Sequence, residues 1–300
     1  MSNFISTTKL YNTRILVIGG TSGVGFGVAR AALEHGASVI LASSNPEKVA
    51  GAVAKLKELY PEEPFVSRIA GRKCDLGNEE TIEGEVLGLL EFASAVDTFA
   101  ATATAGTSAD ADADRSTGRV PINHIVFTAG SIPTDILPPT HPDITPEYLK
   151  SQNTNTTRFI GAALIAKHAA TYMALPSSSS SSSASPSITL TSGVLITRPQ
   201  PNLTYAIAAG AALEGLARGL AVDLAPIRVN VVRLGPVRTG LLDSIGDEET
   251  VGRIWEGHGG KTLLGRVGGV DEVAESYLGV VRDGFITGSV VGVDGGYLLK

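Results

Sequence analysis

The segment "RILVIGGTSGVGFGVARAALE", residues 14 to 34, constrains the fold of this chain more than any other stretch. An apolar, strand-like run is followed by a turn containing Gly19, Gly23 and Gly25, and then by a helical pattern. Glycines at this spacing permit a tight turn and let a pyrophosphate approach backbone N–H groups at the positive end of the helix. The segment therefore predicts a dinucleotide site. Its predicted contacts are Gly19, Thr21, Ser22, Gly23 and Val24.

The alternation of strand and helix patterns continues to the end of the chain. Further strands are predicted at residues 37–43, 65–73, 122–130, 187–193, 227–235 and 288–296. Such alternation is typical of parallel sheets with helices on both faces, so we expect a Rossmann-type, doubly wound α/β fold with seven strands in three α/β/α layers. Two small, polar, aperiodic stretches near 99–119 and 177–185 are expected to be flexible insertions in one domain spanning 1–300.

Charge and composition exclude several classes of partner and site. The formal net charge is −6 and no run of Lys or Arg is present, which argues against binding to nucleic acid. The single cysteine, Cys74, cannot form an internal disulfide or a cysteine-rich metal site, and the five histidines show no metal-ligand spacing. We therefore expect no metal.

The number of cysteines and the length of the apolar runs indicate where in the cell the protein is expected. One cysteine fits a reducing compartment, the N-terminus has no signal-peptide pattern, and no run approaches the ~18 apolar residues that span a bilayer. The expectation is a cytoplasmic protein that acts on a small-molecule substrate away from membranes.

The end of the second strand bears on the identity of the cofactor. An acid there would hold the ribose 2′-hydroxyl of NAD, but the residues present are Ser43, Ser44 and Asn45, followed by a helix start with Lys48. These groups can bind a 2′-phosphate, so NADP(H) is favoured over NAD(H). The alternative is that Ser44 and Asn45 only cap the helix.

Two more strand ends carry predicted dinucleotide contacts. Asp75 and Leu76 follow the third strand, where they either contact the adenine edge or cap a helix predicted at 79–93. Thr128, Ala129 and Gly130 end the fourth strand, beside the dinucleotide at the carboxyl edge of the sheet.

Several motifs, taken in order, resemble the short-chain dehydrogenase/reductase family. They are "GGTSGVG", "CDL", "FTAG", "LTSG" and "LGPVRT", and the match covers nearly the whole chain apart from the two insertions. The resemblance implies that Pro236, Val237 and Thr239 also contact the cofactor. Ile18, Phe127, Thr128 and Leu234 depart from the usual family residues.

The resemblance also implies a catalytic set, which is incomplete in this chain. Ser192 matches the serine that holds the substrate oxygen, and Asn155 matches the asparagine of the proton relay. Tyr205 lies at the usual spacing from Ser192, although the helical pattern after it places the tyrosine position one residue later. The lysine that would lower the tyrosine pKa is replaced by Ala209 or Gly210, depending on the register.

Such a pattern resembles the atypical short-chain reductases of fungal natural-product pathways. It predicts an NADP(H)-dependent reductase of a small carbonyl, enone or iminium compound in specialised metabolism, with Arg158 as a candidate group for a substrate carbonyl or enolate. The alternatives are a non-redox enzyme of the same fold, namely an isomerase, dehydratase or pericyclic cyclase, and a non-catalytic cofactor-binding protein. The resemblance also implies a homodimer or homotetramer that pairs through the helices predicted at 152–173 and 203–225.

Overall fold

Seven parallel strands form the sheet at the centre of this protein. A computed structural model describes residues 6–99, 118–130, 137–151, 156–175, 185–240 and 247–300. The strand order is β3-β2-β1-β4-β5-β6-β7, and all neighbouring pairs are parallel. The strands are β1 (Arg14–Ile18), β2 (Ser38–Ser43), β3 (Ile69–Lys73), β4 (His124–Phe127), β5 (Ser187–Gly193), β6 (Arg228–Leu234) and β7 (Val290–Val293). The predicted Rossmann-type class with seven strands is confirmed.

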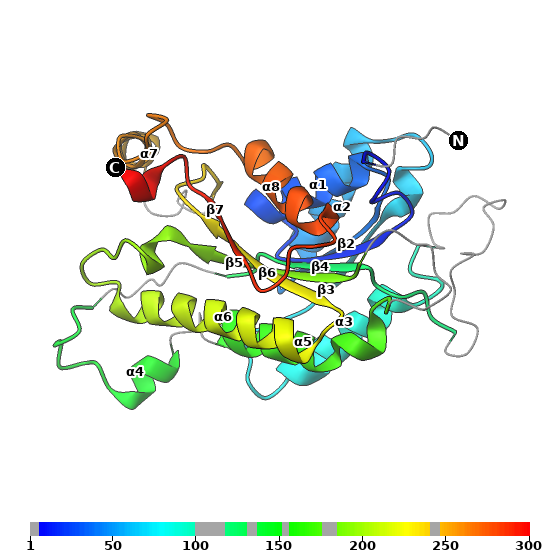
Figure 1. The fold of residues 1–300 in the computed structure, drawn as a ribbon, viewed down its shortest axis with the longest axis horizontal. Coiled ribbons are helices and arrows are strands. Elements are labelled where there is room, and N and C mark those ends of the chain that lie inside the picture. The colour runs from blue at the N-terminus through cyan, green and yellow to red at the C-terminus, as the bar shows by residue number, and fades with distance from the viewer. Residues whose placement is uncertain (1–5, 100–117, 131–136, 152–155, 176–184, 241–246) are drawn as a thin grey trace.

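Helices cover both faces of the sheet and make three layers (Figure 1). One layer contains α1 (Gly23–Glu34), α2 (Pro46–Leu59) and α8 (Val270–Arg282); the other contains α3 (Ile82–Ser94), α5 (Gly161–Tyr172) and α6 (Thr204–Asp223). Two further helices, α4 (Pro146–Ser151) and α7 (Glu248–Gly259), lie at one end of these layers. A π-helical turn, Thr156–Ile160, leads directly into α5.

Side chains of the central strands alternate between two hydrophobic cores, as expected for a sheet buried on both faces. In β1, Leu16 and Ile18 pack in the core beneath α3, α5 and α6. Ile15 and Val17 pack in the core beneath α1 and α8. This double burial explains why β1 is apolar at every position from Ile15 to Ile18.

Helix α6 has an unusual surface for a helix in the outer layer of a sheet. It is long and apolar enough, by length and composition, to cross a membrane, although only 28% of its most apolar window is buried. The helix carries Glu214, Arg218 and Asp223, so it is not an uninterrupted apolar run. The buried positions are Leu213, Glu214 and Ala217, which face the strands, so the helix is an integral layer of the α/β fold.

The two predicted insertions lie outside the described residues except at their ends. Arg119 forms an isolated bridge to Ala95, and Gly118 adopts a φ of +65°. The prediction of one domain with flexible insertions stays a prediction.

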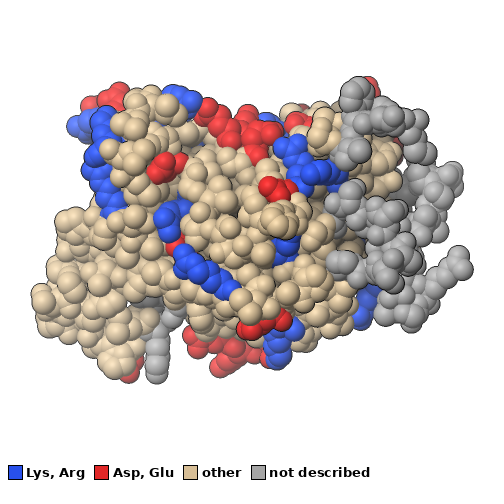
Figure 2. Space-filling model, in the orientation of Figure 1, with Lys and Arg blue, Asp and Glu red and all other residues tan. Residues whose placement is uncertain are grey.

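Charges are mixed on the surface shown in Figure 2. Over the described residues of this face, Lys and Arg lie in small separate groups among acidic and uncharged side chains. This face therefore lacks the extended basic surface that binding to a phosphate backbone requires.

The single cysteine gives a direct test of the core. Cys74 is 3% exposed, and burial, with Glu85 nearby, raises the pKa of its thiol to about 12. At pH 8 only about one thiol in ten thousand would be the reactive thiolate. We expect Ellman's reagent to leave the folded protein unmodified and to titrate one thiol after unfolding in urea; rapid modification of the native protein would contradict this packing.

Candidate active site

The glycine turn lies at the point where the strand order reverses, between β1 and β4. Gly19 has a φ of +87°, and a Cβ on it would lie 2.5 Å from the backbone nitrogen of Ala129. The Thr128 amide and hydroxyl both donate to the Ile18 carbonyl, at 2.8 and 3.1 Å. The ends of β1 and β4 are thereby joined, and the open crevice at such a reversal is where doubly wound sheets bind ligands.

Helix α1 begins at this crevice, with Ser22 as its N-cap residue. The Ser22 side chain makes no capping hydrogen bond, and the first backbone amides of any helix lack intrahelical partners. Gly23 has a φ of +51°, and its Cα faces the side chain of Thr239. The turn residues Thr21 to Val24 lie at this helix start, and their contact with a pyrophosphate stays a prediction.

The residues that follow β2 were predicted either to bind a 2′-phosphate or to cap the next helix, and the structure shows the cap at Asn45. Asn45 accepts a hydrogen bond from the Lys48 amide at 2.8 Å and caps α2, so its side chain is engaged as a helix cap. Ser44 and Lys48 are exposed, Ser43 is half-buried, and residues 42–45 contain no carboxylate. These polar groups lie beside the N-terminus of α2, and their contact with a 2′-phosphate stays a prediction.

Asp75 does not cap a helix. Helix α3 begins at Ile82, later than predicted, and the Asp75 carboxylate accepts from the Gly77 amide at 2.9 Å. This local turn orients the segment that includes the buried Leu76. The capping interpretation was therefore wrong, and an adenine contact stays a prediction.

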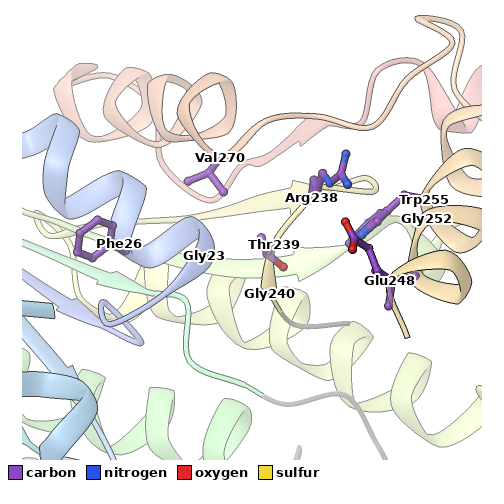
Figure 3. Close-up of a pocket in the computed structure, with 10 residues that line it drawn as sticks. Gly23, Phe26, Arg238, Thr239, Gly240, Glu248, Gly252, Trp255 and Val270 are labelled. Carbon is purple, nitrogen blue, oxygen red and sulfur yellow. The ribbon is translucent and has the colours of Figure 1, made fainter. Parts of the chain in front are cut away.

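A cavity of about 660 Å³ opens between the glycine turn and helix α7 (Figure 3). Its lining residues come from α1, the loop after β6, α7 and the start of α8: Gly23, Phe26, Arg238, Thr239, Gly240, Glu248, Val251, Gly252, Trp255 and Val270. The loop is held by Pro236 and Arg238, whose backbones pair with Gly268. Thr239 therefore borders the predicted cofactor crevice, and cofactor contacts of Pro236, Val237 and Thr239 stay predictions.

Trp255 belongs both to the buried core and to the cavity wall. It is 8% exposed, so it packs as a core residue of α7, and it also forms part of the cavity wall. Its indole gives the α7 side of the cavity an apolar wall.

Ser192 lies at the carboxyl end of β5, but its hydroxyl is not free. Its Oγ donates to Glu214 Oε1 at 2.7 Å, and both side chains are buried. Arg233 binds the same carboxylate twice, Nε to Oε1 at 2.8 Å and Nη2 to Oε2 at 2.6 Å. The sequence analysis missed Glu214 and Arg233. The sequence signal that could have identified Glu214 is its position as an acidic residue within an otherwise apolar helical segment.

The hydroxyl of Tyr205 contacts the backbone at Pro139 and not Ser192. Its hydroxyl lies 3.5 Å from the Pro139 carbonyl, at the limit of a hydrogen bond, and its ring meets Tyr148 edge to face at 6.3 Å. The hydrogen bond of Ser192 goes to Glu214, so the structure does not join the predicted serine and tyrosine.

The structure leaves little space at Gly210, one of the two candidate lysine positions, and Lys167 on α5 is paired with an acid. A Cβ on Gly210 would lie 3.0 Å from Ile196 Cδ1, so the helix packs closely here. Lys167 forms an ion pair with Glu83 on α3. Asn155 lies outside the described residues, and its relay role stays a prediction.

Arg158 reaches the end of β4 from the π-helical turn. Its guanidinium packs against Gly130, where a Cβ would overlap it. Its Nε is buried without a hydrogen-bond partner among the described residues, and burial lowers the pKa of the guanidinium from its ordinary value. A buried, unpaired donor at the cofactor crevice is available to a ligand.

The reversal point, the glycine turn and the cavity define a doubly wound α/β protein of the dinucleotide-binding class. The family model described as an SDR-like Rossmann domain matches residues 6–114 and 113–300. This chain belongs to the short-chain dehydrogenase/reductase family.

Fungal proteins are among its relatives. The short-chain dehydrogenase/reductase malC of Malbranchea aurantiaca is 34% identical over 296 residues, covering 98% of each chain. The short-chain dehydrogenase/reductase ucsE of Acremonium sp is 35% identical over 294 residues, covering 97% of each chain.

Two solved structures are also similar. The MalC reductase/Diels-Alderase from Malbranchea aurantiaca has a TM-score of 0.81 at 34% identity, with 98% of this chain and 100% of that chain covered. A small-chain dehydrogenase in complex with NADPH has a TM-score of 0.65 at 25% identity, with 96% and 100% covered.

Proposed function

We propose that this protein is an NADP(H)-dependent reductase of a small carbonyl, enone or iminium compound in specialised metabolism. The observation that carries the proposal is the crevice between β1 and β4, where the glycine turn meets Thr128, Ala129 and Thr239. Its similarity to malC and ucsE supports the pathway class, and a similar dehydrogenase structure contains NADPH.

The residues present fit a dinucleotide. The amides at the start of α1 would hold the pyrophosphate, and Ser43, Ser44 and Lys48 would hold the 2′-phosphate of NADP. When bound, the cofactor supplies the hydride. The chain itself orients the reacting groups, and Trp255 limits the access of water.

Arg158 would orient the substrate. Its buried guanidinium lies against Gly130 at the nicotinamide side of the predicted crevice, and its Nε has no partner among the described residues. A guanidinium here stabilises negative charge that develops on a substrate oxygen as hydride is accepted at carbon.

NADPH consumption by the purified protein tests the proposal. Dihydroisoquinoline and tetralone, an imine and a ketone of one bicyclic frame, serve as probes. We expect NADPH to bind more tightly than NADH, and Arg158→Gln to lower turnover by about 100-fold with little change in the NADPH Kd. Failure to bind either nucleotide would reject the proposal, and an unchanged turnover in the variant would reject the role of Arg158.

Tyr205→Phe is expected to change NADPH-dependent turnover by no more than about twofold. The substitution keeps the ring contact with Tyr148 and removes only the weak contact with Pro139. A proton donor in the reaction would instead contribute about 10²–10⁴-fold. Steady-state rates with the same probes measure the effect, and a loss of two orders of magnitude would restore Tyr205 as the donor.

One observation favours non-redox chemistry as the second candidate function. Ser192 is bound to Glu214, Tyr205 faces Pro139, and the lysine positions carry Ala209 and Gly210, so the ordinary proton-transfer set is not assembled. The similar MalC protein is described as both a reductase and a Diels-Alderase. Product formation without loss of NADPH absorbance would support this candidate.

We further propose a cytoplasmic homodimer or homotetramer that pairs through α5 and α6. The support is the outward face of α6, where Ala208, Ala211, Ala212, Gly215 and Gly219 are exposed. Small residues let helices approach closely. Light scattering of the purified protein measures the assembly, and a monomer at micromolar concentration would reject it.

A further inference from the structure

Ser192, Glu214 and Arg233 form one buried unit at the carboxyl end of the sheet. Ser192 and Arg233 are register partners on β5 and β6, so their side chains leave the same face of the sheet. Glu214 projects from α6 between them and binds both, with Oγ to Oε1 at 2.7 Å and Nη2 to Oε2 at 2.6 Å. Ser192 and Glu214 are each 4% exposed, so water does not compete for these bonds.

The carboxylate of Glu214 is ionised in this arrangement. Burial opposes the charge, but the hydrogen bonds from Arg233 and Ser192 outweigh it and lower the pKa of Glu214 below its ordinary value. The same pairing raises the pKa of Arg233. An ionised carboxylate can only accept hydrogen bonds, so the Ser192 proton is the one shared between the two groups.

A serine hydroxyl has one proton and two acceptor lone pairs. With the Ser192 proton donated to Glu214, the hydroxyl can offer a ligand only its lone pairs. A substrate carbonyl oxygen needs a donor, and it could use Ser192 only by breaking the bond to a buried, charged acceptor. A substrate group that carries N–H or O–H can bind Ser192 with the existing bond intact.

We infer that Glu214 is a positioning residue that fixes Ser192 as a hydrogen-bond acceptor, and that the substrate group bound at Ser192 is a donor such as a protonated nitrogen or a hydroxyl. This inference rests on the proposed function and names the chemistry of the group that the site takes. Arg233 balances the negative charge of Glu214 and holds its carboxylate within hydrogen-bond distance of the Ser192 hydroxyl.

Equilibrium binding of two probes tests the inference without turnover. Tetrahydroisoquinoline, a cation with N–H donors at neutral pH, is compared with tetralone, which offers only an acceptor, using calorimetry with and without NADP⁺. We expect the wild-type protein to bind the amine at least about tenfold more tightly, and Glu214→Gln or Ser192→Ala to reduce the ratio of affinities to about twofold. The double variant should show no further reduction, because both changes remove the same acceptor.

Glu91→Gln is the matched control. Glu91 is exposed on α3 and does not line the cavity, so the substitution removes the same charge without touching Ser192. The preference should remain in this variant. Circular dichroism and the NADP⁺ Kd check the fold; if Glu214→Gln unfolds the protein, Ser192→Ala carries the test, since it leaves the Glu214–Arg233 pair in place.

The outcomes separate this inference from the proposed function. Preference for tetralone, equal binding, binding of neither probe, or a ratio unchanged in Ser192→Ala would overturn the acceptor role of Ser192. Failure of NADP(H) to bind, together with an amine preference lost in both variants, would instead reject the reductase and keep the serine as an acceptor.

Discussion

Gly25→Ala is expected to weaken NADPH binding by tenfold to a hundredfold. Gly25 is buried in the first turn of α1, and a Cβ there would overlap the Gly19 carbonyl oxygen and the Thr128 hydroxyl. Both neighbours belong to the joined ends of β1 and β4, so the glycine turn must move. Overpacking of this kind costs about 1–3 kcal/mol, and each 1.4 kcal/mol corresponds to about tenfold in affinity. Fluorescence titration of NADPH measures the change.

Gly51→Ala is the control for this substitution. Gly51 is exposed within α2, and nothing lies within 4 Å of a Cβ at that position. Alanine favours a helix by about 0.5–1 kcal/mol over glycine, so the control should be slightly more stable with an unchanged Kd. Equal NADPH affinity in Gly25→Ala and Gly51→Ala would show that the turn is not the cofactor site.

Arg228→Met is expected to lower the free energy of unfolding by about 3 kcal/mol. The buried guanidinium of Arg228 donates to the carbonyls of Val280, Val281, Ile286 and Ser185, at 2.8 to 3.1 Å. Two of these carbonyls belong to the last turn of α8, where no intrahelical donor exists. Methionine preserves much of the volume but leaves the acceptors unsatisfied, at about 1–3 kcal/mol for each that finds no water.

Urea denaturation followed by circular dichroism measures this loss. Arg228→Lys keeps the charge and up to three donors, so it should cost less than Arg228→Met. Arg253, which is exposed on α7, provides the matched control, and Arg253→Met should stay within about 0.5 kcal/mol of wild type. A loss in Arg228→Met no larger than in Arg253→Met would show that the carbonyls find other donors.

Predictions based on local patterns agree closely with the structure. The strand predicted at 187–193 has the observed bounds, and the helix start predicted after Asn45 is confirmed, since α2 begins at Pro46 with Asn45 as its cap. Periodic apolar residues and the Asn45 cap determine these elements, because their information lies within a few neighbouring residues. Helix α3 was predicted to begin three residues too early. Asn78 accepts hydrogen bonds from the amides of Glu80 and Thr81 and forms a separate turn, and the helix begins at Ile82.

The candidate site was predicted less completely, and the errors share one cause. Ser192 was located by its motif, but its partner Glu214 lies 22 residues away and Arg233 a further 19. Neither spacing has a local signature. Tyr205 was identified by its spacing from Ser192 alone. Only the tertiary structure shows that its ring packs against Tyr148.

The sequence by itself determined the fold class, the family and the position of the glycine turn, because strand and helix periods and glycine conformations are local properties of the chain. Only the tertiary structure decided which groups share the proton of Ser192, where Tyr205 points, and that Arg158 lies against Gly130. Those outcomes depend on the register between β5 and β6 and on the packing of α6, which bring distant side chains within hydrogen-bond distance.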